Sequence, residues 1–571
     1  MDFYSEIIAE IKIAKNISKA KINKLKFRLA GKYNLKEVPT DIEVLLNSNK
    51  SDFKLLKNKL MSKPTRTGSG VAVVAIMTSP KECPHAKTGV GPCLMCPGGP
   101  KSAFGNIPQS YTGKEPATMR AIRNRYDPYL QVMNRLEQYI AMGQSPQKVE
   151  LIIMGGTLPS YNKLYKESFI AYAYAALNDF SSLFYKKGEL DLLKYKDFFM
   201  LPGKVDDKSR AKKLQEKMQD LKKLKKRVLS IELSKNESSL IKCVGLTIET
   251  RPDYGKLMQG NEMLTYGCTR VELGIQATDD EILKFIRRGH SVADSIESTR
   301  ILKDLGFKIN YHMMPGLPLS DEKKDVDMLN EIVSNRDFKP DMLKIYPAMV
   351  MNGTALYELW KTGKYTPLTT QKAAEIISEF KRNVPYWMRI MRVQRDIPTN
   401  ATIAGVDRTN LRQYVTALLK EKGIECKCIR CREPKSANIN GYKIFIEKYD
   451  ASRGVEYFIS VEDSIRKTIY GFCRMRFPSQ LLQKEITNDS ALIRELHVYG
   501  QAAELGDSGS VQHRGLGKKL LKKAEEIAKA NKKNKIVVIS GVGVRSYYRK
   551  LGYKKEGPYM VKRLLSQKNS L

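Results

Sequence analysis

The sequence predicts an α/β protein built on a partial (β/α) barrel, with a small helical module before it and an α+β domain after it. Short β-rich runs alternate with long helical stretches, such as residues 117–143, through the middle of the chain. Parallel strands need such crossover connections, so we expect one parallel sheet covered by helices. Functional residues of such a barrel lie at the carboxyl ends of its strands. The predicted strands are residues 71–77, 149–154, 245–250, 271–276, 308–314 and 342–347.

Changes in composition divide the 571 residues into predicted regions. The first region is a predicted helical module whose lysine-rich face could bind a phosphate backbone or only meet solvent. Residues 186–230 form a basic, largely helical insertion in the barrel. A linker with a group of cysteines follows the barrel. Antiparallel-looking strands, a helix and a further strand then indicate a separate α+β domain. The regions are therefore 1–70, 71–395, 396–439 and 440–571.

The chain carries a large positive charge, because lysine and arginine exceed aspartate and glutamate by 38. Each neutralised phosphate releases counterions, so this excess favours a polyanion, above all nucleic acid, as partner. Adaptation to heat or salt is the alternative, but balanced ion pairs would not leave such an excess. We see no apolar run of roughly 18 residues and no secretory signal. We therefore expect no membrane span and a cytoplasmic protein.

Six of the nine cysteines fall into two groups. The first group, Cys83, Cys93 and Cys96, follows the first predicted strand with C-x9-C-x2-C spacing in a loop rich in glycine and proline. Zinc prefers four ligands, whereas a cubane iron–sulfur cluster can take three cysteines and leave one iron open. The position after the first barrel strand favours the cluster, and a structural zinc knuckle is the alternative. The scattered cysteines are expected in the core: Cys243, Cys268 and Cys473.

This loop resembles the cluster-binding loop of the radical S-adenosylmethionine (SAM) superfamily, although the usual spacing there is C-x3-C-x2-C. Two glycines and a threonine follow the second predicted strand, as in the superfamily segment that contacts the SAM amino group. The resemblance implies a radical SAM partial barrel, with a [4Fe–4S] cluster on the three cysteines and SAM on its open iron. The SAM-binding residues that it implies are Gly155, Gly156, Thr157, Glu249 and Gln276.

A second set of motifs lies in the C-terminal domain. A Q-x-x-G-x-G segment stands between a strand and a helix, where backbone N–H groups can hold a pyrophosphate. The segment YYRKLGY at 547–553 follows the next strand. Together they resemble the GNAT acetyltransferases, which bind acetyl-CoA; a glycine-rich turn beside buried tyrosines is the alternative. The implied acetyl-CoA-binding residues are Glu495, Leu496, His497, Val498, Gln512, Gly515, Leu516, Gly517, Lys518 and Tyr548, with His497 expected to be a scaffold residue rather than a base.

The two domains in one chain, with strings such as HMMPGLP, RVQRDIP and RELHVYG, resemble the catalytic subunits of Elongator, archaeal or bacterial type. The C-x9-C-x2-C spacing also matches that family. The resemblance implies an acyltransferase that carboxymethylates C5 of the tRNA wobble uridine. In the family's chemistry a SAM-derived 5′-deoxyadenosyl radical takes hydrogen from the acetyl-CoA methyl, the carbon radical adds to the base, and hydrolysis releases CoA. Lys148 matches a lysine assigned to acetyl-CoA contact, although its local sequence alone favours an ordinary surface lysine. The implied catalytic residues are Lys148, Tyr547 and Tyr548.

Basic and aromatic residues after the cluster loop are candidates for contact with tRNA. Arg120, Arg123 and Arg125 lie in a basic helical stretch and could hold anticodon-loop phosphates. Tyr111 and Tyr126 could stack on splayed bases, and packing in the core is an equal alternative. The phosphate backbone that the lysine-rich face of the N-terminal helical module could bind is then that of tRNA.

The second cysteine group, Cys426, Cys428 and Cys431, has C-x-C-x2-C spacing, which is typical of zinc sites but leaves one ligand missing. Prokaryotic-type relatives carry a similar group, in which a zinc ion stiffens the linker. His290 or His312 could complete the site or lie inside the barrel, so the fourth ligand stays open.

Two other functions compete with this interpretation. A protein lysine acetyltransferase would use the C-terminal domain alone and have a structural iron site. A non-catalytic RNA-binding scaffold would tolerate loss of all three cluster cysteines. The first leaves the charge of +38 unexplained, and neither accounts for both cofactor sites. A monomer, a homodimer and a complex with accessory subunits are all compatible with the sequence.

Overall fold

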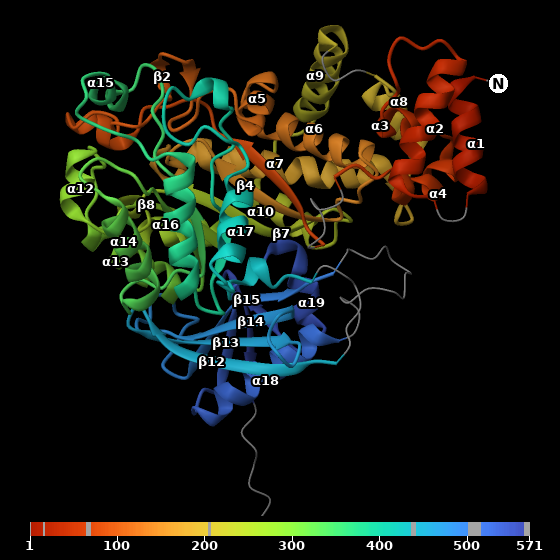
Figure 1. The fold of residues 1–571 in the computed structure, drawn as a ribbon. Coiled ribbons are helices and arrows are strands. Elements are labelled where there is room, and N and C mark those ends of the chain that lie inside the picture. The colour runs from red at the N-terminus through yellow and green to blue at the C-terminus, as the bar shows by residue number, and fades with distance from the viewer. Residues whose placement is uncertain are drawn as a thin grey trace, which may run out of the picture.

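The computed structural model describes residues 2–14, 17–63, 70–203, 207–434, 441–500 and 515–564. A helical N-terminal module, a central α/β domain and a C-terminal sheet domain pack together (Figure 1). This architecture confirms the predicted fold class. Within the described residues, no helix combines the length and apolar character that a membrane crossing requires.

The N-terminal module consists of four helices with capped starts. The side chains of Asp2, Ser18, Thr40 and Asn49 each accept a hydrogen bond from a first-turn N–H. These bonds satisfy donors that have no partner at a helix start. Apolar residues at helical spacing meet in a shared core, while most lysines face outward. The helices are α1 (Phe3–Ile13), α2 (Lys19–Lys32), α3 (Asp41–Leu46) and α4 (Lys50–Leu60).

The central domain contains seven parallel strands in the order β1-β4-β7-β8-β9-β10-β11. The sheet curls into a half-barrel with helices outside it (Figure 1). Six strands match the predicted runs. The seventh, β11, escaped prediction because its sequence RIMR lacks the apolar run typical of a buried strand. The strands are β1 (Ala72–Met77), β4 (Lys148–Met154), β7 (Lys242–Thr250), β8 (Arg270–Gln276), β9 (Lys308–Met313), β10 (Met342–Ile345) and β11 (Arg389–Arg392).

Helices cross between the strands on the outer face. One predicted helical stretch, 117–143, divides in two because Arg125 and Tyr126 have φ angles of 53° and 55°. Asp127 then caps a new helix that begins at Pro128, a position where the missing proline N–H costs nothing. The helices are α5 (Pro116–Arg123), α6 (Pro128–Ala141), α7 (Lys163–Phe184), α10 (Leu229–Asn236), α11 (Leu257–Thr265), α12 (Asp280–Phe285), α13 (Val292–Asp304), α14 (Glu322–Ser334), α15 (Ala355–Lys361), α16 (Thr370–Asn383) and α17 (Leu411–Glu421).

The predicted basic insertion forms a short ribbon and two helices beside α6 and α7. Arg210 anchors it, because its guanidinium pairs with the buried Glu137 of α6 and donates to Phe199 O at 2.8 Å. The elements are β5 (Tyr185–Lys186), β6 (Glu189–Leu190), α8 (Leu192–Phe199) and α9 (Lys208–Lys223).

The C-terminal domain is a second seven-stranded sheet, in the order β12-β13-β14-β15-β16-β18-β17. Its neighbouring strands are antiparallel except β15 and β16, which pair in parallel only from Ser490 to Ile493. Beyond this point β15 continues without β16, which leaves backbone groups available to a ligand. The elements are β12 (Lys443–Ala451), β13 (Gly454–Glu462), β14 (Ile469–Phe477), β15 (Ser490–Val498), α18 (Leu516–Ala530), β16 (Lys535–Val538), α19 (Arg545–Arg549), β17 (Lys554–Glu556) and β18 (Tyr559–Arg563).

A buried network of charges joins the two sheet domains. Arg494 on β15 pairs with Asp341, just before β10, at 2.6 Å and with Glu456 on β13 at 2.9 Å. Arg476 on β14 pairs with Asp304, at the end of α13, at 2.7 Å. None of these side chains is exposed, so each charge depends on its partners to offset desolvation. The network holds the C-terminal domain against the end of the half-barrel where the strands begin.

Candidate active site in the half-barrel and the C-terminal domain

The first cysteine group lies between β1 and a hairpin of β2 (Gly99–Ser102) and β3 (Gly105–Ile107), at the carboxyl end of β1. Cys83 and Cys93 are buried and Cys96 is half-buried. Arg288 donates to Cys93 Sγ at 3.6 Å, and the Ser110 N–H donates to Cys96 Sγ at 3.2 Å. Donors around the sulfur atoms are what an anionic iron–sulfur cluster requires.

Two buried arginines supply positive charge to this loop. Arg251 donates to the carbonyl oxygens of Arg288 at 2.7 Å and Gly289 at 3.0 Å. Burial raises the pKa of the Cys83 thiol, while Arg251 and Arg288 act against this rise. The three sulfur atoms of the described loop do not all lie within 4.8 Å of one another. This spread suits three separate irons better than one zinc ion with bonds of about 2.3 Å, so the residues fit a cubane cluster.

Two predicted SAM-binding glycines follow β4 at the same edge of the sheet. Gly155 and Gly156 have φ angles of 105° and 100°, which side chains rarely accept. A Cβ on Gly155 would lie 2.7 Å from Thr78 Oγ1 and 2.8 Å from Met77 Cγ. On Gly156 the nearest side-chain atom, Gln109 Cβ, would be 3.8 Å away. The chain therefore turns tightly against β1 and leaves space beside Gly156.

Gly155→Ala should lower the free energy of unfolding by about 3 kcal/mol and weaken SAM binding, because strain and a steric contact act together. Gly188→Ala is the matched control: its φ is 83°, but no atom lies within 4 Å of a Cβ there. Its cost should be about 1 kcal/mol, with SAM binding unchanged. Urea unfolding and calorimetric SAM titration of the reconstituted protein test this, and equal costs for the two variants would contradict it.

Inside the half-barrel, four adjacent strands each contribute one ionisable side chain: Glu249 from β7, Glu272 from β8, His312 from β9 and Lys344 from β10. Lys344 forms an ion pair with Glu272, and its Nζ lies 3.4 Å from Glu249 Oε1. The ammonium therefore neutralises two carboxylates that, with His312, are spaced closely enough to hold a metal ion. Burial alone would raise the pKa of Glu272, but Lys344 and His312 hold it well below its usual range.

The sequence indicated only part of this cluster. Glu249 was expected to contact SAM, and it accepts a hydrogen bond from Tyr111 at 3.1 Å. Glu272 and Lys344 were not singled out, and His312 was considered only as a barrel residue or zinc ligand. The sequence signal that could have identified Glu272 and Lys344 is the alternation of side chains along each strand, which places every second residue inside the barrel.

Several buried polar atoms of the barrel interior have no hydrogen-bond partner among the described residues. They include Arg270 Nη2, Gln276 Oε1 and Asn310 Oδ1. Buried polar groups are normally satisfied by protein, water or ligand. The interior is therefore suited to polar occupants, and Gln276, a predicted SAM contact, ends β8 beside this space.

The start of α18 lies beside the end of β15 and α19. Gly515 precedes α18 with a φ of 73°. A Cβ on Gly517 would lie 2.9 Å from the Tyr547 hydroxyl and 3.8 Å from Val498 Cγ2. Val498, Gly515 and Gly517, predicted to bind acetyl-CoA, and Tyr547, predicted to be catalytic, therefore lie around the N-terminus of α18. N–H groups at a helix N-terminus attract phosphate. Leu516 is buried and Lys518 exposed beside this point, and Gln512 lies outside the described residues.

The side chains of β15 alternate between two environments. Leu496 and Val498 pack against the C-terminal core, whereas Glu495 lies 3.5 Å from Lys308 of the half-barrel. Lys308 and Arg474 outweigh the effect of burial and lower the pKa of Glu495 to about 2. Burial lowers the pKa of His497 to about 4. The lowered pKa favours the neutral imidazole, and the ring of His497 stacks on Phe472.

The remaining predicted catalytic residues occupy different places. Tyr548 is buried in the C-terminal core, and burial raises its pKa. Lys148 begins β4 beside Lys242, where burial and Lys242 lower its pKa. A Cβ on Gly543, in the short helix η8 (Val542–Val544), would lie 2.5 Å from Lys242 Cβ. Lys148 is thus at the end of the half-barrel that meets the C-terminal domain.

Comparison with known proteins matches four regions of this chain to family models. Family models match residues 1–68 (ELP3 N-terminal domain), 83–329 (Radical SAM superfamily), 340–421 (Radical SAM C-terminal domain) and 508–566 (acetyltransferase (GNAT) domain). The chain is 44% identical over 540 residues to a tRNA uridine(34) acetyltransferase of Methanocaldococcus jannaschii, covering 92% of this chain and 90% of that protein. The chain belongs to the Elongator complex protein 3 family.

Other members of the Elongator complex protein 3 family are similar over the same length. Human Elongator complex protein 3 is 39% identical over 553 residues, covering 95% of this chain and 93% of that protein. The solved structure of Methanocaldococcus infernus Elp3 with an N-terminal deletion (1–46) matches with a TM-score of 0.69 at 38% identity. The match covers 87% of this chain and 100% of the solved Methanocaldococcus infernus chain. Membership of the radical SAM superfamily implies a [4Fe–4S] cluster and SAM, and the GNAT domain implies acetyl-CoA.

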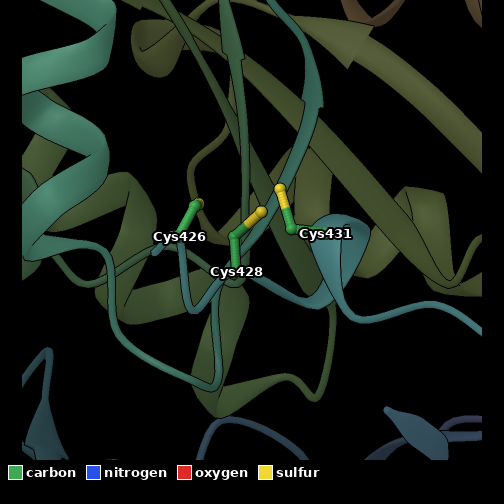
Figure 2. A group of neighbouring side chains, drawn as sticks. All are labelled: Cys426, Cys428 and Cys431. Atoms are coloured by element: carbon green, nitrogen blue, oxygen red, sulfur yellow. The ribbon is translucent and has the colours of Figure 1, made fainter. Parts of the chain in front are cut away.

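In this Elongator complex protein 3 family member, the second cysteine group converges in the linker. The sulfur atoms of Cys426, Cys428 and Cys431 lie within 4.8 Å of one another, and the three side chains are neighbours in the linker (Figure 2). Lys381 of α16 approaches them, with its Nζ 3.1 Å from Cys426 Sγ and 3.5 Å from Cys431 Sγ. Among the described residues, no histidine or carboxylate joins the three sulfurs at this spacing.

Neither histidine considered as the fourth ligand lies at the linker. His312 Nε2 bonds to Glu272 in the barrel, 2.8 Å away. His290 is buried, and the pKa of His290 is lowered to about 2 by burial, Arg288 and Arg251, which places it near the first cysteine loop.

The arginines predicted to contact tRNA do not share one surface. Arg120 is only 8% exposed and donates to Ala75 O at 2.7 Å, which ties α5 to β1. Arg123 is half-buried and Arg125 is exposed. Tyr111 is buried and Tyr126 is half-buried, both in a small cluster with Met77 of β1.

Proposed function

We propose that this protein carboxymethylates C5 of the wobble uridine of tRNA, with acetyl-CoA as the source of the carbon and SAM as the source of the radical. The observation that carries the proposal is that one chain packs a radical SAM half-barrel against an acetyltransferase sheet. The cysteine loop lies at the carboxyl ends of the strands, and the acetyltransferase sheet lies at their other end. The relatives named for tRNA uridine(34) acetylation support the substrate.

The residues of the radical site fit a cluster and SAM. Cys83, Cys93 and Cys96 would hold the cluster, and Arg251 and Arg288 would stabilise its negative charge. The turn at Gly155 and Gly156, with Thr157, would receive SAM. When reduced, the bound cluster and SAM supply one-electron chemistry that can activate an unreactive C–H bond. Such chemistry is required because a methyl group of a thioester and C5 of uridine do not join by simple acyl transfer.

The residues of the opposite end hold and orient the acyl donor. The N–H groups at the start of α18, with Lys518 beside them, would bind the pyrophosphate of acetyl-CoA. The free edge of β15 beyond Ile493 would pair with its pantetheine arm, and Tyr547 lies at the junction of both elements. Lys148, at the start of β4 in the half-barrel, would contact the acyl end of acetyl-CoA. Inside the barrel, Lys344 lowers the pKa of Glu272 and keeps its carboxylate ionised. The charge of this side chain therefore does not change with pH near neutrality.

The linker cysteines would hold one structural zinc ion. Three converging thiols at C-x-C-x2-C spacing are suitable ligands, and Lys381 neutralises part of their charge. Because this linker joins α17 to the C-terminal sheet, a zinc ion there would stiffen the connection between the domains. We infer a cytoplasmic enzyme, since tRNA, SAM and acetyl-CoA are all available there.

Nucleoside mass spectrometry on tRNA incubated with the anaerobically reconstituted full chain tests this function. With reductant, SAM and methyl-¹³C acetyl-CoA, we expect labelled 5-carboxymethyluridine at position 34, and no product when any component is omitted. Metal analysis of the same preparation should find one zinc per chain beside the iron. SAM-independent acetylation of lysine peptides, without modified tRNA, would instead identify a protein acetyltransferase.

A further inference from the structure

A wide basic groove opens between the end of β11 and helix α17. Its volume is about 980 Å³. Five of its lining side chains are cationic and one is acidic, and amide or hydroxyl side chains make up most of the other polar lining. The cationic residues are Arg392, Arg395, Arg412, Lys420 and Arg430, and the acidic residue is Asp396.

The groove lies at the open side of the half-barrel. β11 is the last strand of the sheet and pairs only with β10, so the barrel is not closed between β11 and β1. Arg395 crosses this opening, because its guanidinium donates to Ser110 O and lies 5.8 Å from the centre of the Tyr111 ring. Ser110 in turn donates its N–H to Cys96. One end of the groove therefore contacts the cysteine loop at the mouth of the barrel.

The charges of the groove are not balanced within it. Asp396 pairs with Arg392, and Arg430 donates to Glu433 at 2.9 Å. Arg412 and Arg430 both line the groove, from α17 and from the linker. Like charges held this close favour an anion between them. Gln394, Asn410, Gln413, Thr409 and Thr416 add the neutral donors that contact a sugar–phosphate backbone.

We propose that this groove binds the phosphodiester backbone of the RNA segment next to the nucleotide that enters the half-barrel. The inference rests on the proposed function, which requires an RNA loop to reach the cysteine loop. Loop nucleotides are recognised when their backbone is held while a base is splayed out. The groove is placed to hold that backbone, since its inner end adjoins the barrel mouth and its outer end reaches Arg430 in the linker. The same phosphate chemistry occurs in CoA, so the test separates these two ligands.

The test measures binding of a fluorescent anticodon stem-loop RNA to the full chain at several salt concentrations. The variant Arg412→Gln/Arg430→Gln should weaken binding by about tenfold and reduce the slope of log K against log salt by about 1.4, which corresponds to two phosphate contacts. Arg412→Lys/Arg430→Lys should stay within about threefold of the parent, since charge is retained. The matched control is Lys529→Gln/Arg563→Gln, which removes two exposed cations of the C-terminal domain. It should leave affinity and slope unchanged, and thermal unfolding should show that all variants fold.

Each other outcome overturns the inference. Unchanged affinity and slope in the Arg412→Gln/Arg430→Gln variant would show that the groove does not hold RNA. An equal loss in the control variant would show that only net charge matters. Loss of CoA binding, or displacement of the RNA by CoA, would assign the groove to CoA. If groove variants bind and modify tRNA normally, only this inference fails; if the parent protein produces no modified tRNA, the proposed function fails instead.

Discussion

Replacing Cys93 by serine should abolish tRNA modification while leaving the fold intact. Serine has nearly the same size, but its hydroxyl is not a thiolate and does not ligate the irons of such a cluster. Cys93 is also the cysteine that contacts both Arg288 and His85, at 3.6 Å each. Removal of a residue that hydrogen-bonds to a metal ligand typically costs about 10- to 100-fold in metal affinity or activity. Loss of a ligand itself should therefore lower the yield of modified uridine by more than about 100-fold.

The measurements are iron content, visible absorbance of the reconstituted protein and nucleoside mass spectrometry. Cys268→Ala is the matched control, because Cys268 is buried in the core outside both cysteine groups. It should keep the iron, the absorbance and the activity. A Cys93→Ser protein with normal product would exclude the cluster from the reaction and favour the acetyltransferase domain acting alone.

Arg494→Met should lower the free energy of unfolding by about 3–5 kcal/mol, because it leaves Asp341 and Glu456 buried without their main partner. Arg494 also donates to Phe307 O at 2.7 Å, so the substitution removes a direct bond between the two domains. Methionine fills much of the space, so the expected loss comes from charge rather than from a cavity.

Urea unfolding followed by fluorescence measures this loss. The control is Lys323→Met, whose ion pair with Asp327 is exposed on α14. Its removal should change stability by less than about 1 kcal/mol. If both variants lose the same small amount, the buried network does not hold the domains together.

Much of the fold could be predicted because it depends on local patterns. Six of the seven strands of the half-barrel have apolar runs, and the C-terminal sheet shows the strand, glycine turn and helix order that the structure contains. β11 was missed because its short run RIMR is half charged. The stretch 117–143 was predicted as one continuous helix. The break at Arg125 and Tyr126 was missed because their positive φ angles follow from the tertiary context and not from residue type.

The candidate site divides in the same way. Glycines and cysteines at special spacing can be recognised in the sequence, since their backbone and ligand chemistry are local. Arg120 could not be distinguished from Arg125 by sequence, and the structure shows that the first is buried against β1 and the second is exposed.

The sequence by itself determined the order of the domains, the two cysteine groups and the two cofactor motifs, because each depends on residues that are neighbours in the chain. Only the tertiary structure decided which distant residues meet. Glu249, Glu272, His312 and Lys344 come from four strands and form one cluster because parallel strands place equivalent positions side by side. The buried pairing of Arg494 with Asp341 likewise decided which end of the half-barrel the C-terminal domain covers, since unpaired charges cannot be buried cheaply.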